Sequence, residues 1–498
     1  MILVTLAVTL VMAMAILSDW RRALPWLFGI GVLQDVLRKL TPNVPATYIL
    51  WIGAMFALVA LMAYSQGALR GRWRALALGD AGLRQAWSLF ALVVVAQAAH
   101  AVLRWGNPLI GALGIAFYLG PVLALMVGMA YARSLDQIDR LLGTYVLIMV
   151  PAVLTVYLSA DYGAQWPVLR EVGFLTGQQL LIHYGGQVLE SLPGVFRVGE
   201  LAAWHAATSI AFLSILVLRR PSLVRVIGAG LLGALLIGAI LLTGRRKMLM
   251  ALTLFFSFQW VLIILLRQGA TRLSGALLAL ALTLAVGFSF LGHEEADIQR
   301  ATYVDRGLTV FESTGERWET TMNLVQSAWY RSRGLGVGAG VAGQGGRYAG
   351  GGGAEAVGGA AEAGLGFIIV ELGLPGVLAM VWLMFLLVRR LWQGLRLLAW
   401  VNPPLLVYAV SFAALLMANL ATFGVAVQLF SDYAVLITLG LTAGMLFALI
   451  DAGIQDYGSR LAAWHAGGWL RAGRSDVRAD AVANAVAVAV ANANADDA

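Results

Sequence analysis

The chain has 498 residues, of which 60% are hydrophobic and only 12% are charged, with a net charge of +8 and no cysteine. Soluble domains carry about 25% charged residues, so this composition excludes a soluble globular protein. The lack of cysteine excludes disulfides, thiolate metal sites and a cysteine nucleophile.

Long apolar runs make up most of the chain. A helix needs roughly 20 apolar residues to cross a bilayer, and no stretch shows the alternating polarity of membrane-barrel strands. We therefore predict an all-α, polytopic membrane protein with about twelve transmembrane helices. The predicted helices are 1–17, 46–64, 86–104, 109–131, 141–159, 203–218, 222–243, 247–267, 273–291, 363–388, 404–426 and 430–452.

The first run is expected to remain in the membrane as a helix. Arg21 and Arg22 follow it rather than precede it, which is the reverse of the charge order in a signal peptide. Residues 23–38 then have only a short apolar part, because Asp35 and Arg38 interrupt it. We predict a re-entrant or interfacial helix there, with a thirteenth crossing as the alternative.

The short loops predict the orientation of these helices. Arginine is concentrated in three loops and in the tail after 453, and all fall on one side when the helices alternate: 65–85, 132–140 and 389–403. The positive-inside rule assigns that side to the cytoplasm. The segment 160–203, the turn 244–247 and a large loop at 292–362, between the ninth and tenth helices, are then extracytoplasmic.

The turn before the eighth helix carries Arg245, Arg246 and Lys247 on the predicted outer face. Two interpretations stay open there. In the first, the cations snorkel to lipid headgroups. In the second, they form an anion site, in which guanidinium groups bind phosphate bidentately and the N-terminus of the following helix favours the same anion. If the segments 160–203 and 292–362 fold over the helix ends, Arg197 and Arg317 join them in one pocket.

The large loop has three parts. Residues 293–319 are polar and predicted to be partly helical, and 320–333 have the apolar spacing of an amphipathic helix lying on the membrane. Residues 334–359 are rich in glycine, which predicts a mobile or ligand-ordered flap, or a linker. The G-x-G-x-x-G at 338–343 follows no strand, and His293–Asp297 lacks metal-ligand spacing. We therefore expect no cofactor and no metal.

Several residues in order carry a resemblance. They are Arg197 before a helix, Thr243-Gly244-Arg245 at a helix end, Arg317-Trp318 in the large loop, Gly334-Leu-Gly-Val-Gly338, and Glu371-Leu-Gly-Leu-Pro-Gly376. This order resembles the O-antigen ligase and O-antigen polymerase superfamily of bacterial polysaccharide assembly, best over 197–380. Ligases of that family carry a His-Asn pair where this chain has Glu362-Ala363, which favours a polymerase-like member.

The resemblance implies a multi-pass enzyme of the bacterial inner (plasma) membrane. It would be a metal-independent, inverting glycosyltransferase that polymerises polyprenyl-diphosphate-linked oligosaccharide repeat units of an exported polysaccharide at the outer face. The diphosphate would be bound by Arg197, Arg245, Arg246 and Arg317, with Lys247 and Glu371 in support.

Two carboxylates leave alternatives open. Glu362 is the candidate general base, but it also fits a role in orienting the acceptor or in capping the tenth helix. Glu371 lies deeper in that helix and needs a partner or a water-filled cavity. A structural pair with an arginine and an acceptor-binding role both satisfy this, and the structural role is favoured.

Other functions remain as alternatives. A ligase would transfer finished glycan to a lipid or protein acceptor. A flippase or other transporter would carry the lipid-linked glycan, and a non-catalytic export partner would bind other polysaccharide assembly proteins. The expected partners are the bilayer and the lipid-linked glycan, with no nucleic acid.

The chain divides into four predicted parts. Residues 1–196 form N-terminal transmembrane helices, and 197–380 form the ligase/polymerase-like core with its outer loop. Residues 381–455 form C-terminal transmembrane helices, and 456–498 form a low-complexity cytoplasmic tail that is predicted to be disordered.

Overall fold

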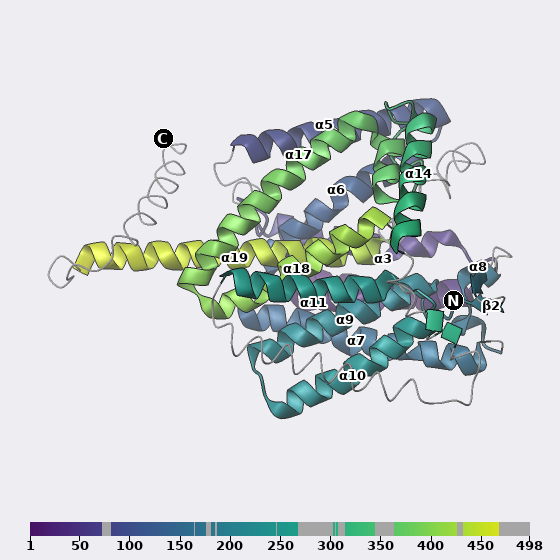
Figure 1. Cartoon of the computed structure of the whole chain (residues 1–498), viewed down its shortest axis with the longest axis horizontal. Helices are drawn as coiled ribbons and strands as arrows, with labels where there is room; N and C mark the ends of the chain where they lie inside the picture. The colour runs from purple at the N-terminus through teal and green to yellow at the C-terminus, as the bar shows by residue number, and fades with distance from the viewer. Residues whose placement is uncertain are drawn as a thin grey trace.

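Long helices run side by side in alternating directions (Figure 1). The computed structural model describes residues 1–71, 81–163, 165–175, 181–184, 187–245, 247–266, 302–303, 305–306, 314–343, 363–425 and 432–467. Within these ranges, 11 helical segments are long and apolar enough to cross a membrane. The prediction of an all-α, multi-pass membrane protein is thereby confirmed. The predicted span at 273–291 and much of the loop 292–362 lie outside the described residues.

The elements follow in chain order. The first half contains α1 (Ile2–Ala23), η1 (Leu24–Trp26), α2 (Leu27–Leu40), η2 (Ala46–Leu50), α3 (Trp51–Ser65), α5 (Ala81–Trp105), α6 (Pro108–Tyr131), α7 (Leu135–Tyr162), η3 (Pro167–Leu169) and α8 (Val172–Leu175). The second half contains β1 (Leu181–Tyr184), β2 (Gln187–Glu190), α9 (Gly199–Arg219), α10 (Leu223–Leu242), α11 (Lys247–Leu266), α14 (Thr314–Ser332), α17 (Gly364–Val401), α18 (Pro403–Val425) and α19 (Tyr433–Gly467).

Short polar residues start several of the long helices. The Asn107 side chain accepts the N–H of Leu109 at 2.9 Å, and Pro108 takes the first helical position of α6. Ser134 caps α7 and Ser222 caps α10 in the same way. These side chains satisfy backbone donors that have no partner within the helix, so the capping residues fix where the apolar segments begin.

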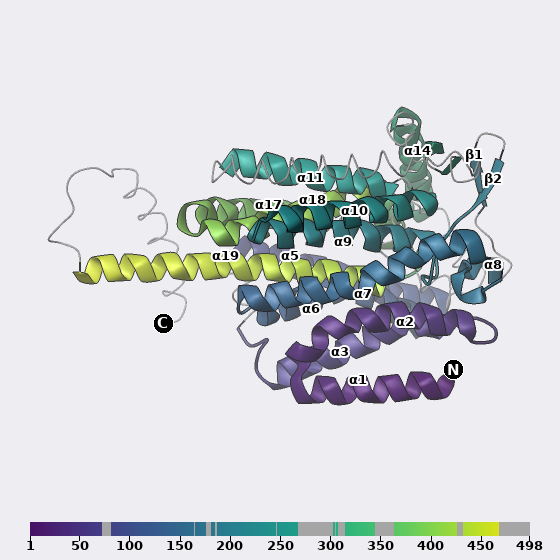
Figure 2. The ribbon, with the colours of Figure 1, turned by 90° about the horizontal axis from the view of Figure 1, so that it is seen from below.

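Helix α2 is the segment for which two interpretations were open. The chain departs from helical geometry at Asp19 and turns at η1, and α2 then runs back towards the end where α1 begins (Figure 2). Its 14 residues span about 21 Å, which is short of the roughly 30 Å hydrocarbon core. The helix is buried in the protein, with Asp35 and Arg38 among its buried residues, which is unlike an interfacial helix; the re-entrant alternative stays a prediction.

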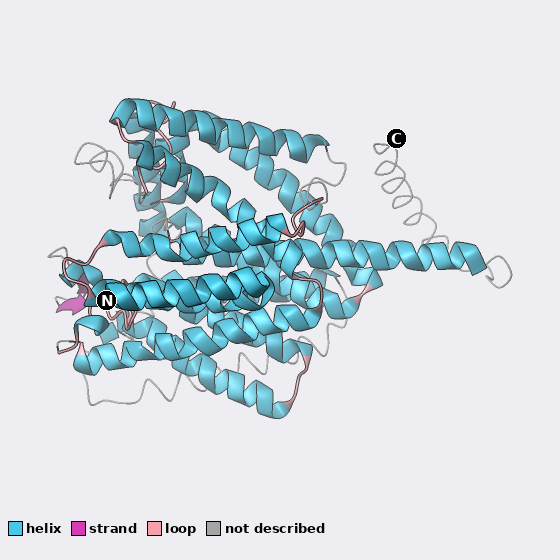
Figure 3. Cartoon of the chain, turned by 180° about the vertical axis from the view of Figure 1, so that it is seen from behind, coloured by secondary structure: helices cyan, strands magenta, loops and turns pink. Residues whose placement is uncertain are grey.

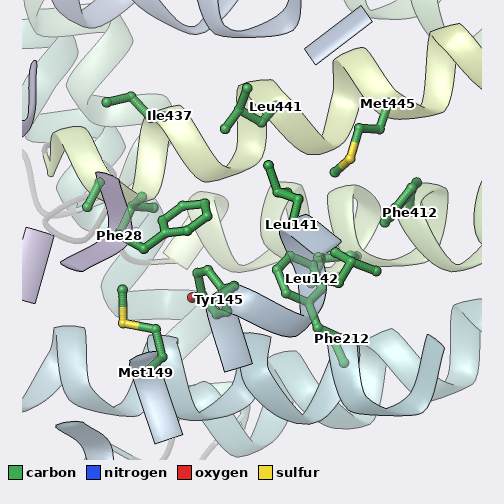
Figure 4. Close-up of a cluster of buried hydrophobic side chains, with 14 of the residues drawn as sticks. Phe28, Leu141, Leu142, Tyr145, Met149, Phe212, Phe412, Ile437, Leu441 and Met445 are labelled. Atoms are coloured by element: carbon green, nitrogen blue, oxygen red, sulfur yellow. The ribbon is translucent and has the colours of Figure 1, made fainter. Parts of the chain in front are cut away.

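Helix α9 forms the centre of the bundle. It packs against α7, α10, α18 and α11, and 89% of its membrane-spanning window is buried. Around it lies the main apolar core, part of which is drawn in Figure 4 with side chains from α2, α7, α9, α18 and α19: Phe28, Leu141, Leu142, Tyr145, Met149, Phe212, Phe412, Ile437, Leu441 and Met445.

One end of the bundle, which we call the polar end, gathers the connections that carry most buried charge. They are the segment 163–198, the turn 243–247 and the start of α19. The strands β1 and β2 form an antiparallel hairpin there (Figure 3), with Leu181 paired to Glu190 and Tyr184 paired to Gln187. This hairpin was not predicted, although Gly185-Gly186 between two short segments is a sequence signal for a two-residue hairpin turn.

Helix α14 crosses the polar end rather than running along the bundle (Figures 1 and 2), and it packs against α17. This confirms the helix predicted at 320–333, which begins earlier, at Thr314. Two other boundaries were wrong. The predicted loop 389–403 is helical, because α17 continues to Val401, and α19 continues past 456 to Gly467. Residues 468–498 lie outside the described residues.

Candidate functional site

The polar end buries charged side chains from five parts of the chain: α2, the segment 163–198, the first turn of α9, the turn 243–247 and the residue before α19. They are Asp35, Lys39, Glu171, Arg197, Glu200 and Asp432, with the partly exposed Arg245 and Lys247 beside them. Buried charges are costly unless they are paired. The partners of each cation therefore show which cations serve to stabilise the fold.

Arg197 is committed to two aspartates. Its Nη2 lies 2.6 Å from Asp432 Oδ2 and its Nη1 lies 3.7 Å from Asp35 Oδ1. Its backbone N–H also donates to Asp35 Oδ2 at 3.0 Å. Asp432 in turn caps α19, because its Oδ1 accepts the N–H of Val435 at 3.1 Å. We call Asp35, Arg197 and Asp432 the ionic clamp, since it ties α2, the segment before α9 and α19 together.

Lys39 is committed to backbone carbonyls of the same segment. Its Nζ donates to Val168 O and Gly194 O, each at 3.0 Å, and to Phe196 O. An ammonium has three protons to donate, so these contacts use its full capacity. Lys39 therefore holds the segment 163–198 against α2.

Arg245 lies in the turn between α10 and α11. Gly244 ends α10 with a φ of +68° and donates its N–H to Leu241 O at 2.8 Å, the arrangement that glycine favours after a helix. The Arg245 backbone N–H then donates to Thr243 Oγ1 at 3.3 Å. The Thr-Gly-Arg sequence thus positions the guanidinium group at the polar end.

The counter-ion of Arg245 is Glu171. Arg245 Nη2 lies 3.9 Å from Glu171 Oε1, and the Val172 N–H donates to Arg197 O at 2.9 Å, which connects this pair to the ionic clamp. Burial raises the pKa of Glu171 to about 7, against the opposing effects of Arg245 and Lys39. Burial also lowers the pKa of Arg245, and Glu171 opposes that shift.

Lys247 opens α11 and forms an ion pair with Glu200 in the first turn of α9. The Ser191 hydroxyl, in the segment 163–198, donates to Thr243 O at 3.5 Å and holds the turn 243–247 against that segment. Arg197, Arg245 and Lys247 therefore lie at one end of the bundle. The pocket predicted from Arg197, Arg245, Arg246 and Arg317 stays a prediction, because the side chains of Arg246 and Arg317 are outside the described part of the chain.

Glu371 is satisfied differently from the prediction. Its Oε1 accepts the backbone N–H groups of Ala342 at 2.7 Å and Gly343 at 3.1 Å, while its Oε2 is buried and has no hydrogen-bond partner among the described residues. Backbone amides thus take the place of the expected arginine. Glu371 anchors the glycine-rich segment to α17, which is the structural role that the sequence favoured.

The glycine-rich segment 334–343 is buried between α5, α6 and α17. The prediction of a flap or linker was therefore wrong for this part of 334–359. The Gly334 carbonyl accepts the Leu374 N–H at 2.8 Å, beside a break in α17 where Gly373 has a φ of +66°. A side chain at Gly340 would place its Cβ 2.1 Å from Ile110 O on α6. The glycines here permit close backbone packing; residues 344–359 lie outside the described ranges.

The remaining predicted residues are placed only in part. The backbone at Arg317 lies near the start of α14, but its side chain is outside the described part of the chain. Arg246 and the candidate base Glu362 also lie outside it, as does His293–Asp297. Across the residues that are described, no group of three or more His, Asp or Glu side chains is placed to hold a metal ion.

The acidic residues of the site were not predicted from the sequence. Asp35 and Glu171 lie in predicted outer segments, and Glu200 and Asp432 lie close to the predicted outer end of an apolar run, where an acid is usually solvated. The feature they share in the sequence is that the predicted topology places them on the same side of the membrane as the cations. Comparison with known proteins adds no assignment: no family model and no curated protein matches this chain.

Proposed function

We propose that this protein is a glycosyltransferase that polymerises polyprenyl-diphosphate-linked oligosaccharide repeat units at the polar end, which would face the outside of a bacterial inner membrane. The observation that carries this function is the state of Arg245. Its Nε is buried and makes no hydrogen bond to the described residues, and its nearest acid is 3.9 Å away. A guanidinium group in this state retains donors for a phosphate.

The cations at the polar end then have separate roles. Arg245 is the principal diphosphate ligand, and Lys247 at the start of α11 adds charge beside it. Arg197 is a positioning residue, because the ionic clamp uses its guanidinium group. Arg246, Arg317 and Glu362 keep the roles that the resemblance implies for them.

The proposed reaction forms one bond to the anomeric carbon and breaks another. An acceptor sugar hydroxyl attacks the anomeric carbon of the donor, and the bond from that carbon to the diphosphate oxygen breaks. The hydroxyl proton passes to the Glu362 carboxylate as general base. The polyprenyl diphosphate leaves with the bonding electrons, and Arg245 stabilises the charge that develops on it.

The distribution of charge favours an enzyme over a transporter. A protein that carries an anionic lipid headgroup across the membrane needs polar groups along the route. Between His205 and Arg219, the central helix α9 contains no ionisable residue. Chemistry at one face is consistent with this arrangement.

A strain whose surface polysaccharide depends on this protein would test the function. Arg245→Ala should lower polymer yield by about 10²-fold or more, as expected for loss of transition-state charge stabilisation, and Glu362→Gln should lower it comparably. Arg225→Ala, on the opposite end of α10, is the matched control and should leave the yield unchanged.

The lipid-linked material that accumulates identifies the reaction. Single repeat units on the lipid carrier would support the polymerase. Full-length polymer left on the carrier would instead indicate a ligase, and repeat units retained on the cytoplasmic face would indicate a flippase. Normal polymer from Arg245→Ala at wild-type abundance would contradict the proposed site.

A further inference from the structure

Glu171 and Arg245 face each other, and neither side chain is fully satisfied. Their closest charged atoms are 3.9 Å apart, which exceeds a hydrogen-bond distance. Glu171 Oε1 and Arg245 Nε are both buried and lack a hydrogen-bond partner within the described residues. Buried polar atoms are rarely left in this state. The pair therefore holds an unused acceptor and an unused donor at the same place.

We propose that Glu171 is a placeholder anion: it neutralises Arg245 when the site is empty and, as a neutral carboxylic acid, donates a hydrogen bond to the diphosphate when the donor binds. This role rests on the proposed function, because it concerns the same diphosphate site. It assigns to Glu171 the coupling between donor binding and proton uptake.

The surrounding groups act on the charge of Glu171 in opposite directions. Lys39 is held by backbone carbonyls, and Arg197 is held by the ionic clamp. The charged groups that act on Glu171 are Arg245 from the turn 243–247, Lys39 from α2 and Glu190 from β2. The two cations favour the carboxylate, while Glu190 and burial favour the acid.

Binding then requires a proton. A diphosphate diester carries two negative charges, and an ionised carboxylate beside it would be repelled. One proton from solvent forms an O–H bond on Glu171, and no other bond changes. Since burial brings the pKa of Glu171 to about 7 in the empty site, this proton uptake would occur at neutral pH.

Isothermal titration calorimetry on the full chain in lipid nanodiscs tests this coupling. The probe is P1-farnesyl P2-methyl diphosphate, a diester whose phosphates do not titrate near neutral pH. We expect wild-type Kd to be about tenfold weaker at pH 8 than at pH 6, by linkage to a single group of pKa about 7. Titrations in two buffers of different ionisation enthalpy should show close to one proton taken up at pH 8.

The Glu171→Gln variant should bind at pH 8 about as tightly as wild type does at pH 6, without proton uptake. Its amide donates the same hydrogen bond without titrating. Glu190→Gln is the matched control, because it removes the other nearby carboxylate, which is exposed. It should keep the proton uptake on binding, with the pH dependence shifted to lower pH because Glu190 favours the acid form of Glu171. Each variant is first checked for wild-type elution and thermal midpoint; if Glu171→Gln fails this check, Glu171→Ser provides a second neutral donor with the same expected result.

The possible results distinguish the role of Glu171 from the existence of the diphosphate site. Wild-type proton uptake in Glu171→Gln, or weaker binding than wild type at pH 8, would overturn the role of Glu171. If Arg245→Ala abolished binding in the same series, the diphosphate site itself would stand. Binding that is unaffected by Arg245→Ala would overturn both.

Discussion

Two regions of this protein bury carboxylates, and they differ in whether an arginine side chain is among the partners. At the polar end, Asp35, Asp432 and Glu171 face the side chains of Arg197 and Arg245. Within α17, Glu371 faces backbone amides of the segment 334–343. A side-chain counter-ion can be exchanged for a ligand, whereas a backbone amide fixes the path of the chain. The polar end is therefore the region suited to binding, and the Glu371 region is suited to holding shape.

The largest expected effect comes from the ionic clamp. Arg197→Met should lower stability by about 3–5 kcal/mol, because it leaves buried carboxylates without their cation. Arg245→Met, at the same end, should cost less than Arg197→Met, since its ion pair is long and Glu171 can take up a proton instead of remaining a buried unpaired charge. Thermal unfolding in detergent would measure both. Equal midpoints for the two variants would remove the distinction between a positioning and a binding arginine.

The Glu371 region should show an effect of about 2 kcal/mol. Glu371→Leu removes the acceptor of two buried N–H groups, and each unsatisfied donor costs about 1–3 kcal/mol, partly offset by no longer burying a charge. Glu371→Gln keeps an acceptor oxygen and should be much closer to wild type. The comparison requires only thermal midpoints, and a milder effect of Leu than of Gln would contradict the anchoring role.

Part of the pH dependence of stability should come from Glu171. A carboxyl whose pKa is higher folded, about 7, than unfolded, about 4.5, binds more protons in the folded state. Stability should therefore be highest below about pH 4.5 and fall as pH rises through 7, by about 1–3 kcal/mol from this group. Midpoints measured from pH 5 to 8 should differ in slope between wild type and Glu171→Gln, and that difference is the contribution of Glu171.

The smallest effect is expected at the opposite end of the bundle. Arg219 pairs there with Asp136, whose side chain is 82% exposed, as well as with Asp139. Asp136→Asn should change stability by less than about 1 kcal/mol, because solvent screens an exposed pair. A larger loss in the same thermal assay would show that ion pairs at the two ends are not distinguished by burial.

The sequence predicted the parts of this fold that depend on local composition. Apolar runs located the long helices, and their alternation placed Arg197, Arg245 and Lys247 at one end. The anchoring role of Glu371 also followed from its depth in an apolar helix.

The partners of these residues were not predictable in the same way. Asp432 meets Arg197 only because α19 and α2 lie beside the segment before α9, and alternation predicts which end a residue occupies but not its neighbour. Glycine content alone likewise did not distinguish a loose loop at 334–343 from tight packing, because Gly340 serves close backbone contact with α6.

Helix α19 joins the two ends of the molecule in a single rod. Its 35 residues extend about 52 Å, well beyond the roughly 30 Å of a bilayer core, and no proline interrupts it. It begins immediately after Asp432 and projects past the other helices at its far end (Figure 2). A change in tilt at its first turn, where Asp432 pairs with Arg197, would therefore displace its projecting end further than the part of the helix that lies among the other helices.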